Sequence, residues 1–144
     1  MRHAPKAFAL AALFVLLSFS SALGQSDRQT IIYIPFKFSV GEKSFASGTY
    51  AIERNKRDSD LVWVIKRKGN NGSAVVMTQP VSSSKTMEET RLVFHRYEDV
   101  YFLAEFWTPG SNTGRQVQLS DREKVLEKTL AGQRVDHVLI DRGR

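Results

Sequence analysis

The residues able to carry chemistry are few, and two histidines are the first to consider. His95 lies three residues before Glu98, and His137 directly follows Asp136. Imidazole and carboxylate groups are ordinary metal ligands, so either histidine could belong to a metal site. Neither has a second histidine two or four residues away, and the H-E-x-x-H pattern is absent. We therefore expect no metal ligands, and histidines that face solvent or are satisfied by hydrogen bonds.

Glu105 is the most distinctive acidic residue, because it interrupts an otherwise apolar strand pattern. A buried carboxyl group at this position would suit the general acid of a small hydrolase. A cross-strand ion pair is the commoner role, and we predict Arg96, on the preceding strand, as its partner. The chain has no cysteine, no G-x-S-x-G elbow and no glycine-rich phosphate-binding motif. We therefore expect no catalytic residues and no cofactor; a hydrolase using Glu105 or His95 is an alternative.

A basic run leads into the turn expected at 69–72. It consists of Lys66, Arg67 and Lys68. Such a run at the end of a hairpin could contact an anionic envelope polymer, phospholipid head groups or a protein partner. The alternative is a solvated loop end that discourages edge pairing. We name Lys66, Arg67 and Lys68 as candidate residues for binding an anionic partner, and we expect no nucleic acid because export removes the usual target.

Four aromatic residues are candidates for an exposed stacking surface: Trp63, Tyr97, Tyr101 and Trp107. Aromatic side chains that lie flat on a sheet can stack on sugar rings, but they more often bury large areas in the core. We assign Trp63 to the core. Trp107 lies next to the expected loop at 109–114, so we keep it as a candidate surface aromatic.

The N-terminal 24 residues read as a targeting segment. Arg2 and Lys6 precede an apolar run at 7–19, and small residues follow up to Gly24. This order is typical of a secretory signal peptide, and the run is shorter than the 20 or so residues of a membrane anchor. We predict a signal peptide at 1–24, a mature chain beginning at Gln25, and a periplasmic or secreted protein with no further transmembrane segment. Removal of residues 1–24 lowers the formal net charge from +6 to +4.

The remaining chain reads as one β-rich domain at 25–144. Hydrophobic residues make up 42% of the chain, which excludes a disordered protein. Alternation with a period of two predicts strands at 32–40, 43–45, 49–54, 61–68, 73–79, 90–97, 100–108 and 133–141. Pro35 indicates an edge or a bulge in the first of these. The pattern predicts a mainly β fold, an antiparallel β-sandwich or small β-barrel of about seven to eight strands.

One helix is expected near the C-terminus, from Asp121 to Ala131. Ser120 and Glu123 form a capping box, in which the Ser120 hydroxyl accepts from the Glu123 amide and the Glu123 carboxylate reaches back. Gly132 supplies the stop signal. The apolar stripe of this segment is narrow, so we expect the helix to lie on the surface of the sheet.

Two sets of motifs extend over most of the chain after the targeting segment. They read IPFKFSVG at 34–41, SGTY at 47–50, LVFHRY at 92–97, YFL at 101–103 and WT at 107–108. Together they resemble a family of small exported bacterial proteins, common in acidobacteria, with the motifs IPF-x-F-x-VG, AG-x-Y and FHRY…YFL…W. The resemblance implies export and no particular activity, so it carries over no site residues. Members usually have Gly where this chain has Glu98, which leaves the turn type after Tyr97 open.

These observations favour an exported, non-catalytic accessory or interaction module of the envelope or the extracellular space. A small barrel that binds an apolar ligand is the first alternative, because barrels of about eight strands can enclose one small molecule. A small hydrolase is the second. The large apolar residues on both faces of the strands at 61–68 and 100–108 favour a filled interior, and hence the interaction module.

Overall fold

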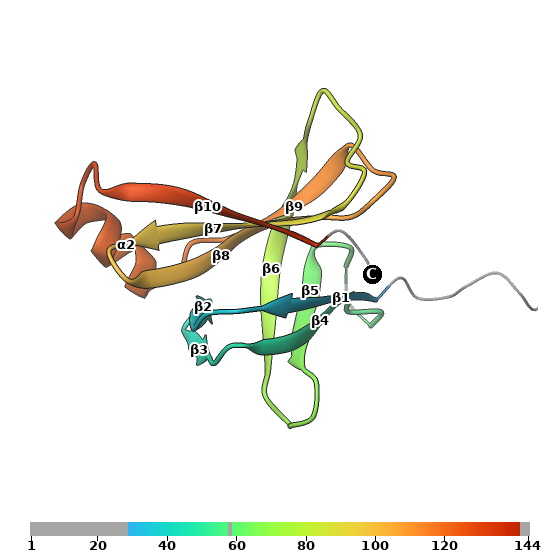
Figure 1. Cartoon of the computed structure of the whole chain (residues 1–144), viewed down its shortest axis with the longest axis horizontal. Coiled ribbons are helices and arrows are strands. Elements are labelled where there is room, and N and C mark those ends of the chain that lie inside the picture. The colour runs from blue at the N-terminus through green and yellow to red at the C-terminus, as the bar shows by residue number, and fades with distance from the viewer. Residues whose placement is uncertain (1–28, 58, 142–144) are drawn as a thin grey trace, which may run out of the picture.

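The computed structural model describes residues 29–57 and 59–141, so the predicted signal peptide at 1–24 lies outside the described residues. Within them the protein is mainly β, with ten strands in one mixed sheet that is not closed, and a single helix near the C-terminus (Figure 1). The strands are β1 (Thr30–Ile34), β2 (Phe38–Val40), β3 (Lys43–Phe45), β4 (Gly48–Arg54), β5 (Val62–Arg67), β6 (Ser73–Ser82), β7 (Thr90–Tyr97), β8 (Val100–Trp107), β9 (Thr113–Val117) and β10 (Arg134–Asp141). The helix is α2 (Asp121–Thr129). The predicted fold class is confirmed.

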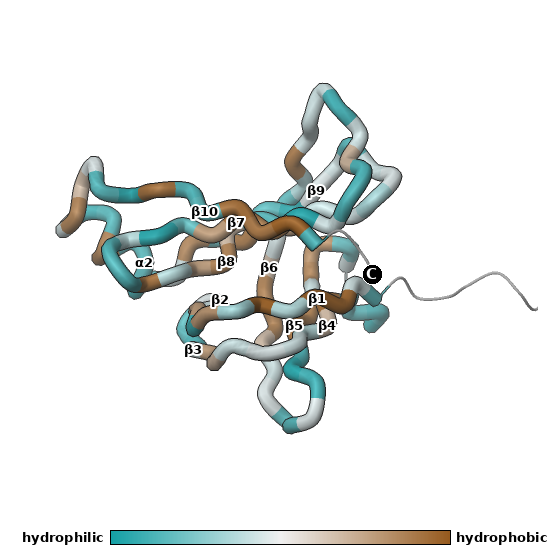
Figure 2. The backbone as a smooth tube through the Cα atoms, in the orientation of Figure 1, coloured by the Kyte–Doolittle hydropathy of each residue, from teal (hydrophilic) through white to brown (hydrophobic). Residues whose placement is uncertain are grey.

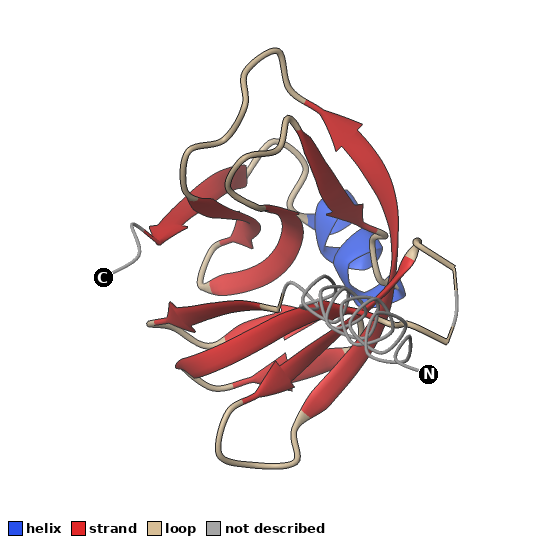
Figure 3. Cartoon of the chain, turned by 90° about the vertical axis from the view of Figure 1, so that its right-hand side faces the viewer, coloured by secondary structure: helices blue, strands red, loops and turns tan. Residues whose placement is uncertain are grey.

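The strands lie in two layers that share β6 (Figure 3). In one layer β1, β4 and β5 pair in this order with the first half of β6, from Ser73 to Met77. The second half of β6, from Thr78 to Ser82, pairs with β9, which continues through β8 and β7 to β10. The short β2 pairs with β3 on one side. On the other side it pairs in parallel with β8, where Ser39 lies opposite Phe102.

The hydrophobic core lies between the layers and draws on strands from both. Its buried members are Ile32, Ile34, Phe38, Val40, Phe45, Tyr50, Ile52, Ile65, Ala74, Val76, Leu92, Phe94, Leu103, Phe106 and Val117. The Phe38 ring meets the rings of Phe45, Tyr50 and Phe94 at centroid distances of 5.7, 4.9 and 5.7 Å, which are normal for aromatic pairs. Hydrophobic residues follow the strands, while the turn between β5 and β6 is hydrophilic (Figure 2). The interior is therefore filled by side chains.

A β-bulge in the hairpin of β7 and β8 reverses the alternation of the sequence. Phe94 pairs with Leu103, but the next pair along is Val93 with Glu105, so Ala104 has no partner. An extra residue of this kind switches which side chains face the core. Leu103 and Phe106 consequently both point into the core. Strict alternation along the strand predicted at 100–108 puts Leu103 and Phe106 on opposite faces, and the bulge makes this expectation wrong.

Trp107 lies on the opposite face of β8 from Phe106 and is packed against Gly114 of β9. An added Cβ atom at Gly114 would lie 2.4 Å from Cδ2 of the Trp107 ring, so only a glycine leaves room for the indole. The side chain of Trp107 is 6% exposed. The prediction of Trp107 as a surface aromatic is therefore wrong, because its indole is buried against Gly114.

Two strands differ from the sequence prediction. The strand expected to end before Pro80 continues as β6 to Ser82, because by that point β6 has left β5 and pairs only with β9, so a residue without an N–H is tolerated. The segment at 113–117 forms β9, where the sequence predicted a loop up to Gly114. The first predicted strand is divided into β1 and β2, and with β9 this brings the described sheet to ten strands.

Other elements agree with the sequence. Pro35 follows β1, which is an edge strand, and β5 lies between β4 and β6 as expected for a strand with two apolar faces. The segment at 134–141 forms β10, as predicted. The helix ends two residues earlier than predicted, at Thr129 with a cap at Leu130. Across residues 29–57 and 59–141, no helix has the length and apolar character needed to cross a membrane.

Candidate functional site

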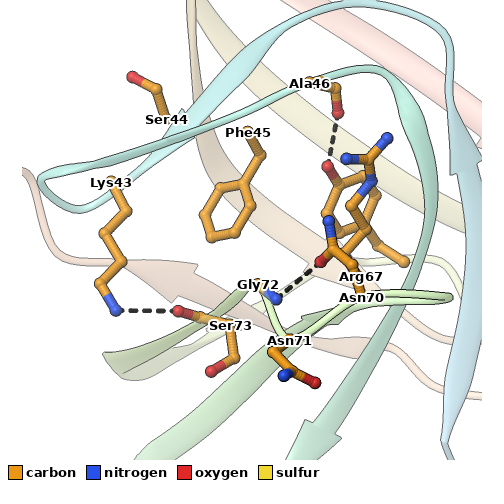
Figure 4. Close-up of a pocket in the computed structure, with 10 residues that line it drawn as sticks. Lys43, Ser44, Phe45, Ala46, Arg67, Asn70, Asn71, Gly72 and Ser73 are labelled. Atoms are coloured by element: carbon orange, nitrogen blue, oxygen red, sulfur yellow. Dashed lines mark hydrogen bonds between the residues drawn. The ribbon is translucent and has the colours of Figure 1, made fainter.

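The β2–β3 hairpin and the turn between β5 and β6 enclose a pocket of about 450 Å³ (Figure 4). Its lining residues are Lys43, Ser44, Phe45, Ala46, Tyr50, Arg67, Asn70, Asn71, Gly72 and Ser73. The lining contains two cationic side chains and no acidic one. The pocket is therefore positively charged, and most of its remaining walls are polar.

The cations stand on either side of the Phe45 ring (Figure 4). Nζ of Lys43 donates a hydrogen bond to the carbonyl oxygen of Ser73 at 3.0 Å. Nη2 of Arg67 donates to the carbonyl oxygen of Ser47 at 3.2 Å. Both acceptors are neutral, and neither cation forms a salt bridge within the described part of the chain. These contacts orient the two charges without neutralising them.

Tyr50 supports the floor of the pocket. Its hydroxyl donates to the carbonyl oxygen of Ala46 at 2.5 Å, which fixes the chain between β3 and β4. Burial raises the pKa of Tyr50, and the nearby Arg67 guanidinium opposes this by lowering it. The phenol is therefore neutral at physiological pH and adds no negative charge to the pocket.

The turn at 68–72 is held by its own hydrogen bonds. Gly69 has a φ of 84°, a backbone conformation that favours glycine, and it lies in the turn expected at 69–72. The amide of Gly72 donates to Oδ1 of Asn70 at 2.7 Å, and the amide of Arg67 donates to the carbonyl oxygen of Gly72 at 2.8 Å. The turn thus presents Asn70 and Asn71 to the pocket from a defined backbone.

The predicted basic run is divided by the alternation of β5. Lys66 forms an ion pair with Glu53 of β4 on the outer face of the sheet. Arg67 is on the inner face and lines the pocket, while Lys68 is exposed at the start of the turn. The three residues therefore do not form one patch. Sequence reasoning missed Lys43, which lies far from the run in sequence and joins it only through the pairing of the elements.

His95 takes part in a buried polar cluster on the outer face of β7. Its Nδ1 lies 2.6 Å from Oε1 of Glu123, and the same oxygen accepts a hydrogen bond from the Tyr97 hydroxyl at 3.3 Å. The Glu123 amide donates to Ser120 Oγ at 3.1 Å, which confirms this half of the capping box. The carboxylate does not reach back to Ser120, because it binds His95 and Tyr97 instead. Burial, followed by the Glu123 charge, raises the pKa of Tyr97 to about 12.

The other candidate residues have local partners. Glu105 accepts a hydrogen bond from Nε1 of Trp107 at 3.0 Å, and it does not pair with Arg96 as predicted. Nε of Arg96 donates to the carbonyl oxygen of Glu98 at 2.7 Å, and its guanidinium lies over the Tyr101 ring. Because of the bulge and the strand register, Glu105 faces Val93 rather than Arg96.

His137 is surrounded by rings rather than by metal ligands. It meets Phe36 and Tyr101 edge to face, at centroid distances of 5.2 and 5.5 Å. In the described ranges no group of three or more His, Cys, Asp or Glu side chains could hold a metal ion. Neither His95 nor Glu105 lines the pocket of Lys43 and Arg67.

Trp63 is half-buried and packs against the edge of the core, as the assignment to the core requires. Its ring also meets Phe106 at 4.8 Å and lies beneath the guanidinium of Arg115. Of the two tryptophans, Trp63 is therefore the one that reaches a pocket, whereas Trp107 is buried. The position of Trp107 next to a loop had indicated the wrong tryptophan as the more accessible one.

Comparison with known proteins adds no information on identity: no family model, curated protein or solved structure matches the chain.

Proposed function

We propose that the protein is a non-catalytic binding module that recognises an anionic group of an envelope or extracellular polymer in the pocket of Lys43 and Arg67. The observation that carries this proposal is a concave site with two cations and no carboxylate. An arginine can bind a carboxylate or a phosphate through two parallel N–H bonds, and a lysine adds a mobile point charge.

The setting of the charges favours binding over mere solvation. Carbonyl oxygens hold both side chains in place, so an arriving anion meets oriented donors and does not have to break an ion pair. The amide groups of Asn70 and Asn71 add neutral donors at the rim. A pocket also favours one protruding anionic group over the flat array of head groups on a membrane surface.

The alternatives have less support. A barrel that binds an apolar ligand needs an empty interior, whereas the space between the layers is occupied by core residues and the sheet is not closed. A hydrolase built on Glu105 or His95 needs these groups at a shared pocket, but Glu105 is bonded to Trp107 and His95 to Glu123. No observation of the described residues favours either alternative over the binding module.

Export and membership of the acidobacterial-type family belong to the same proposal. In support of the resemblance, Glu98 has a φ of 52°, and it occupies the position where members of that family usually carry Gly. A glycine adopts this backbone without the steric cost of a Cβ atom. Mass spectrometry of exported material tests the targeting part: a chain starting at Gln25 or a neighbouring residue is expected, and an intact Met1 would contradict it.

Soluble polyphosphate is the probe that tests the binding function. Lys43→Gln and Arg67→Gln should each weaken its binding about tenfold at low salt, the equivalent of one charge-assisted hydrogen bond. High salt should weaken binding to the unchanged protein as well. Lys66→Gln is the matched control, because it removes the same charge from the other face of β5. Equal losses in the three variants would show that net charge alone drives binding, and would contradict the proposed site.

A further inference from the structure

A second pocket lies at the opposite end of the inner face of β5. Trp63, Ile65 and Arg67 alternate along that face, so the buried Ile65 separates the two sites. This pocket has a volume of about 210 Å³. It is lined by Trp63, Phe106, Thr108, Thr113, Gly114 and Arg115. The space therefore combines aromatic walls, two hydroxyl groups and one cation, a different chemistry from that of the Lys43 and Arg67 pocket.

Arg115 is the informative residue of this pocket. Its Cζ lies 5.8 Å from the centroid of the Trp63 ring, a cation–π arrangement. Its guanidinium makes no hydrogen bond and no ion pair with the described part of the chain, although it carries five N–H donors. Stacking on an indole holds the plane of the guanidinium but leaves the donors on its edge free. Arg115 is thus held over the Trp63 ring, and its edge donors are available to a ligand in the pocket.

Arg96 shows that the pattern at Arg115 is not general in this protein. The Arg96 guanidinium also lies over an aromatic ring, 5.7 Å from the centroid of Tyr101. Its Nε, however, donates to the carbonyl oxygen of Glu98 at 2.7 Å, and Arg96 lines neither this pocket nor that of Lys43 and Arg67. The Arg96 interaction is therefore internally satisfied, whereas that of Arg115 is not.

The walls around Arg115 are fixed. Nε1 of Trp63 donates to the carbonyl oxygen of Asp60 at 3.1 Å, which holds the indole in its orientation. The Phe106 ring meets the Trp63 ring at 61° and is 4% exposed. At Gly114 the wall is bare backbone backed by the Trp107 ring. A ring-shaped ligand would therefore meet a preformed apolar wall in a pocket that Thr108 and Thr113 also line.

We propose that this second pocket binds an acidic sugar, with the ligand carboxylate on the Arg115 guanidinium and the sugar ring against Trp63 and Phe106. The guanidinium matches the carboxylate through two parallel hydrogen bonds. The aromatic walls match the apolar face of a pyranose ring, and the threonines match its hydroxyl groups. The volume suits one monosaccharide unit, free or at the end of a longer chain. The site does not depend on the Lys43 and Arg67 pocket.

Sodium glucuronate is the probe, and the indole Nε1–H resonances of the purified protein are the readout. The sequence contains two tryptophans, so each resonance can be assigned with a Trp63→Phe variant. Glucuronate should shift the Trp63 resonance in a saturable manner and leave that of the buried Trp107 nearly unchanged. Glucose should bind at least tenfold more weakly, because it lacks the carboxylate. Absence of saturation by glucuronate, or equal binding of glucose, would overturn the proposal.

Arg115→Gln should weaken glucuronate binding at least tenfold, while Arg96→Gln, which removes the same charge from a stacked arginine elsewhere, should leave it within twofold. Arg115→Lys keeps the charge and loses the planar fork, so it should also weaken binding, and it serves as the second variant if Arg115→Gln does not fold. If Arg115→Lys and Arg96→Gln both bound glucuronate as tightly as the unchanged protein, the role of the guanidinium would be overturned. Tighter binding of benzoate than of glucuronate would overturn the assignment to a sugar.

Discussion

Nδ1 of His95 lies 2.6 Å from Oε1 of Glu123, and this contact joins the outer face of β7 to α2. The side chains are 11% and 5% exposed, and the Tyr97 hydroxyl completes the cluster. The narrow apolar stripe of α2 offers the sheet little hydrophobic surface. The polar cluster therefore attaches the helix to β7, while Nη1 of Arg122 attaches its first turn to β2 and β3 through Ser39 Oγ and Ser44 Oγ.

Removal of the Glu123 carboxylate should destabilise the protein. Glu123→Ala leaves His95 and Tyr97 without their shared acceptor in a buried site, so the free energy of unfolding should fall by about 3 kcal/mol. Unfolding in urea, followed by circular dichroism, measures this loss. Glu127→Ala is the control, because Glu127 pairs with Arg134 at 3.3 Å where both are exposed, and such a pair contributes less than about 1 kcal/mol. Similar losses in both variants would contradict the structural role of Glu123.

Tyr97 should make the stability fall at alkaline pH. Its pKa is raised to about 12 in the folded protein, above the usual value of 10.0. A raised pKa means that the folded state favours the neutral phenol, so its contribution is complete below pH 10.0 and is lost as the pH rises through about 12. Over this pH range, the free energy of unfolding of Tyr97→Phe should fall by roughly 2 kcal/mol less than that of the unchanged protein. Parallel pH profiles of the two proteins would contradict the assignment.

Glu98 occupies a backbone conformation that suits glycine, with a φ of 52°. Glu98→Gly removes the steric cost of the Cβ atom, about 1 kcal/mol, and increases the entropy of the unfolded chain by somewhat less. The net expectation is a gain of about 0.5 kcal/mol in the free energy of unfolding. Asp99→Gly, at the next residue, has no positive φ to relieve and should destabilise. A loss in Glu98→Gly as large as that in Asp99→Gly would be inconsistent with the strained turn.

Gly114 should not tolerate a larger residue while Trp107 is present. Gly114→Ala places a Cβ atom 2.4 Å from the Trp107 ring, and overpacking of this kind costs about 1–3 kcal/mol. Trp107→Leu should make room for the added methyl group. The double variant is therefore expected to lose less stability than the two single variants together, as measured in a double-mutant cycle. Additive losses would show that the two residues do not press on each other.

The strands were predictable because alternation survives in most of them, and β5 shows this best. The prediction failed where one residue breaks the period: the unpaired Ala104 moves Leu103 and Phe106 to the same face and turns Trp107 away from the core. A bulge of this kind has no clear sequence signature, because Ala104 fits either face of a strand. The end of β6 was predicted wrongly for a different reason. Pro80 is tolerated within the strand because β6 pairs there with β9, and this pairing is not visible in the sequence.

The candidate site was predictable only in part. Arg67 belongs to a visible basic run, but its partner Lys43 is joined to it by tertiary pairing alone. The alternation of β5 could have separated Lys66 from Arg67, whereas the Glu53 partner of Lys66 follows from the register with β4. The contact of His95 with Glu123 joins a strand and a helix, and no local pattern predicts it.

Binding of an anion between Lys43 and Arg67 can be followed by an NMR titration of the purified protein with inorganic phosphate. We expect saturable shifts of the backbone amides of Asn71 and Gly72, with little change at Glu53 on the outer face of the sheet. The shifts should be lost in Arg67→Gln and retained in Lys66→Gln. Shifts at Glu53 instead of the turn, or equal shifts in the two variants, would contradict an anion-binding pocket at Lys43 and Arg67.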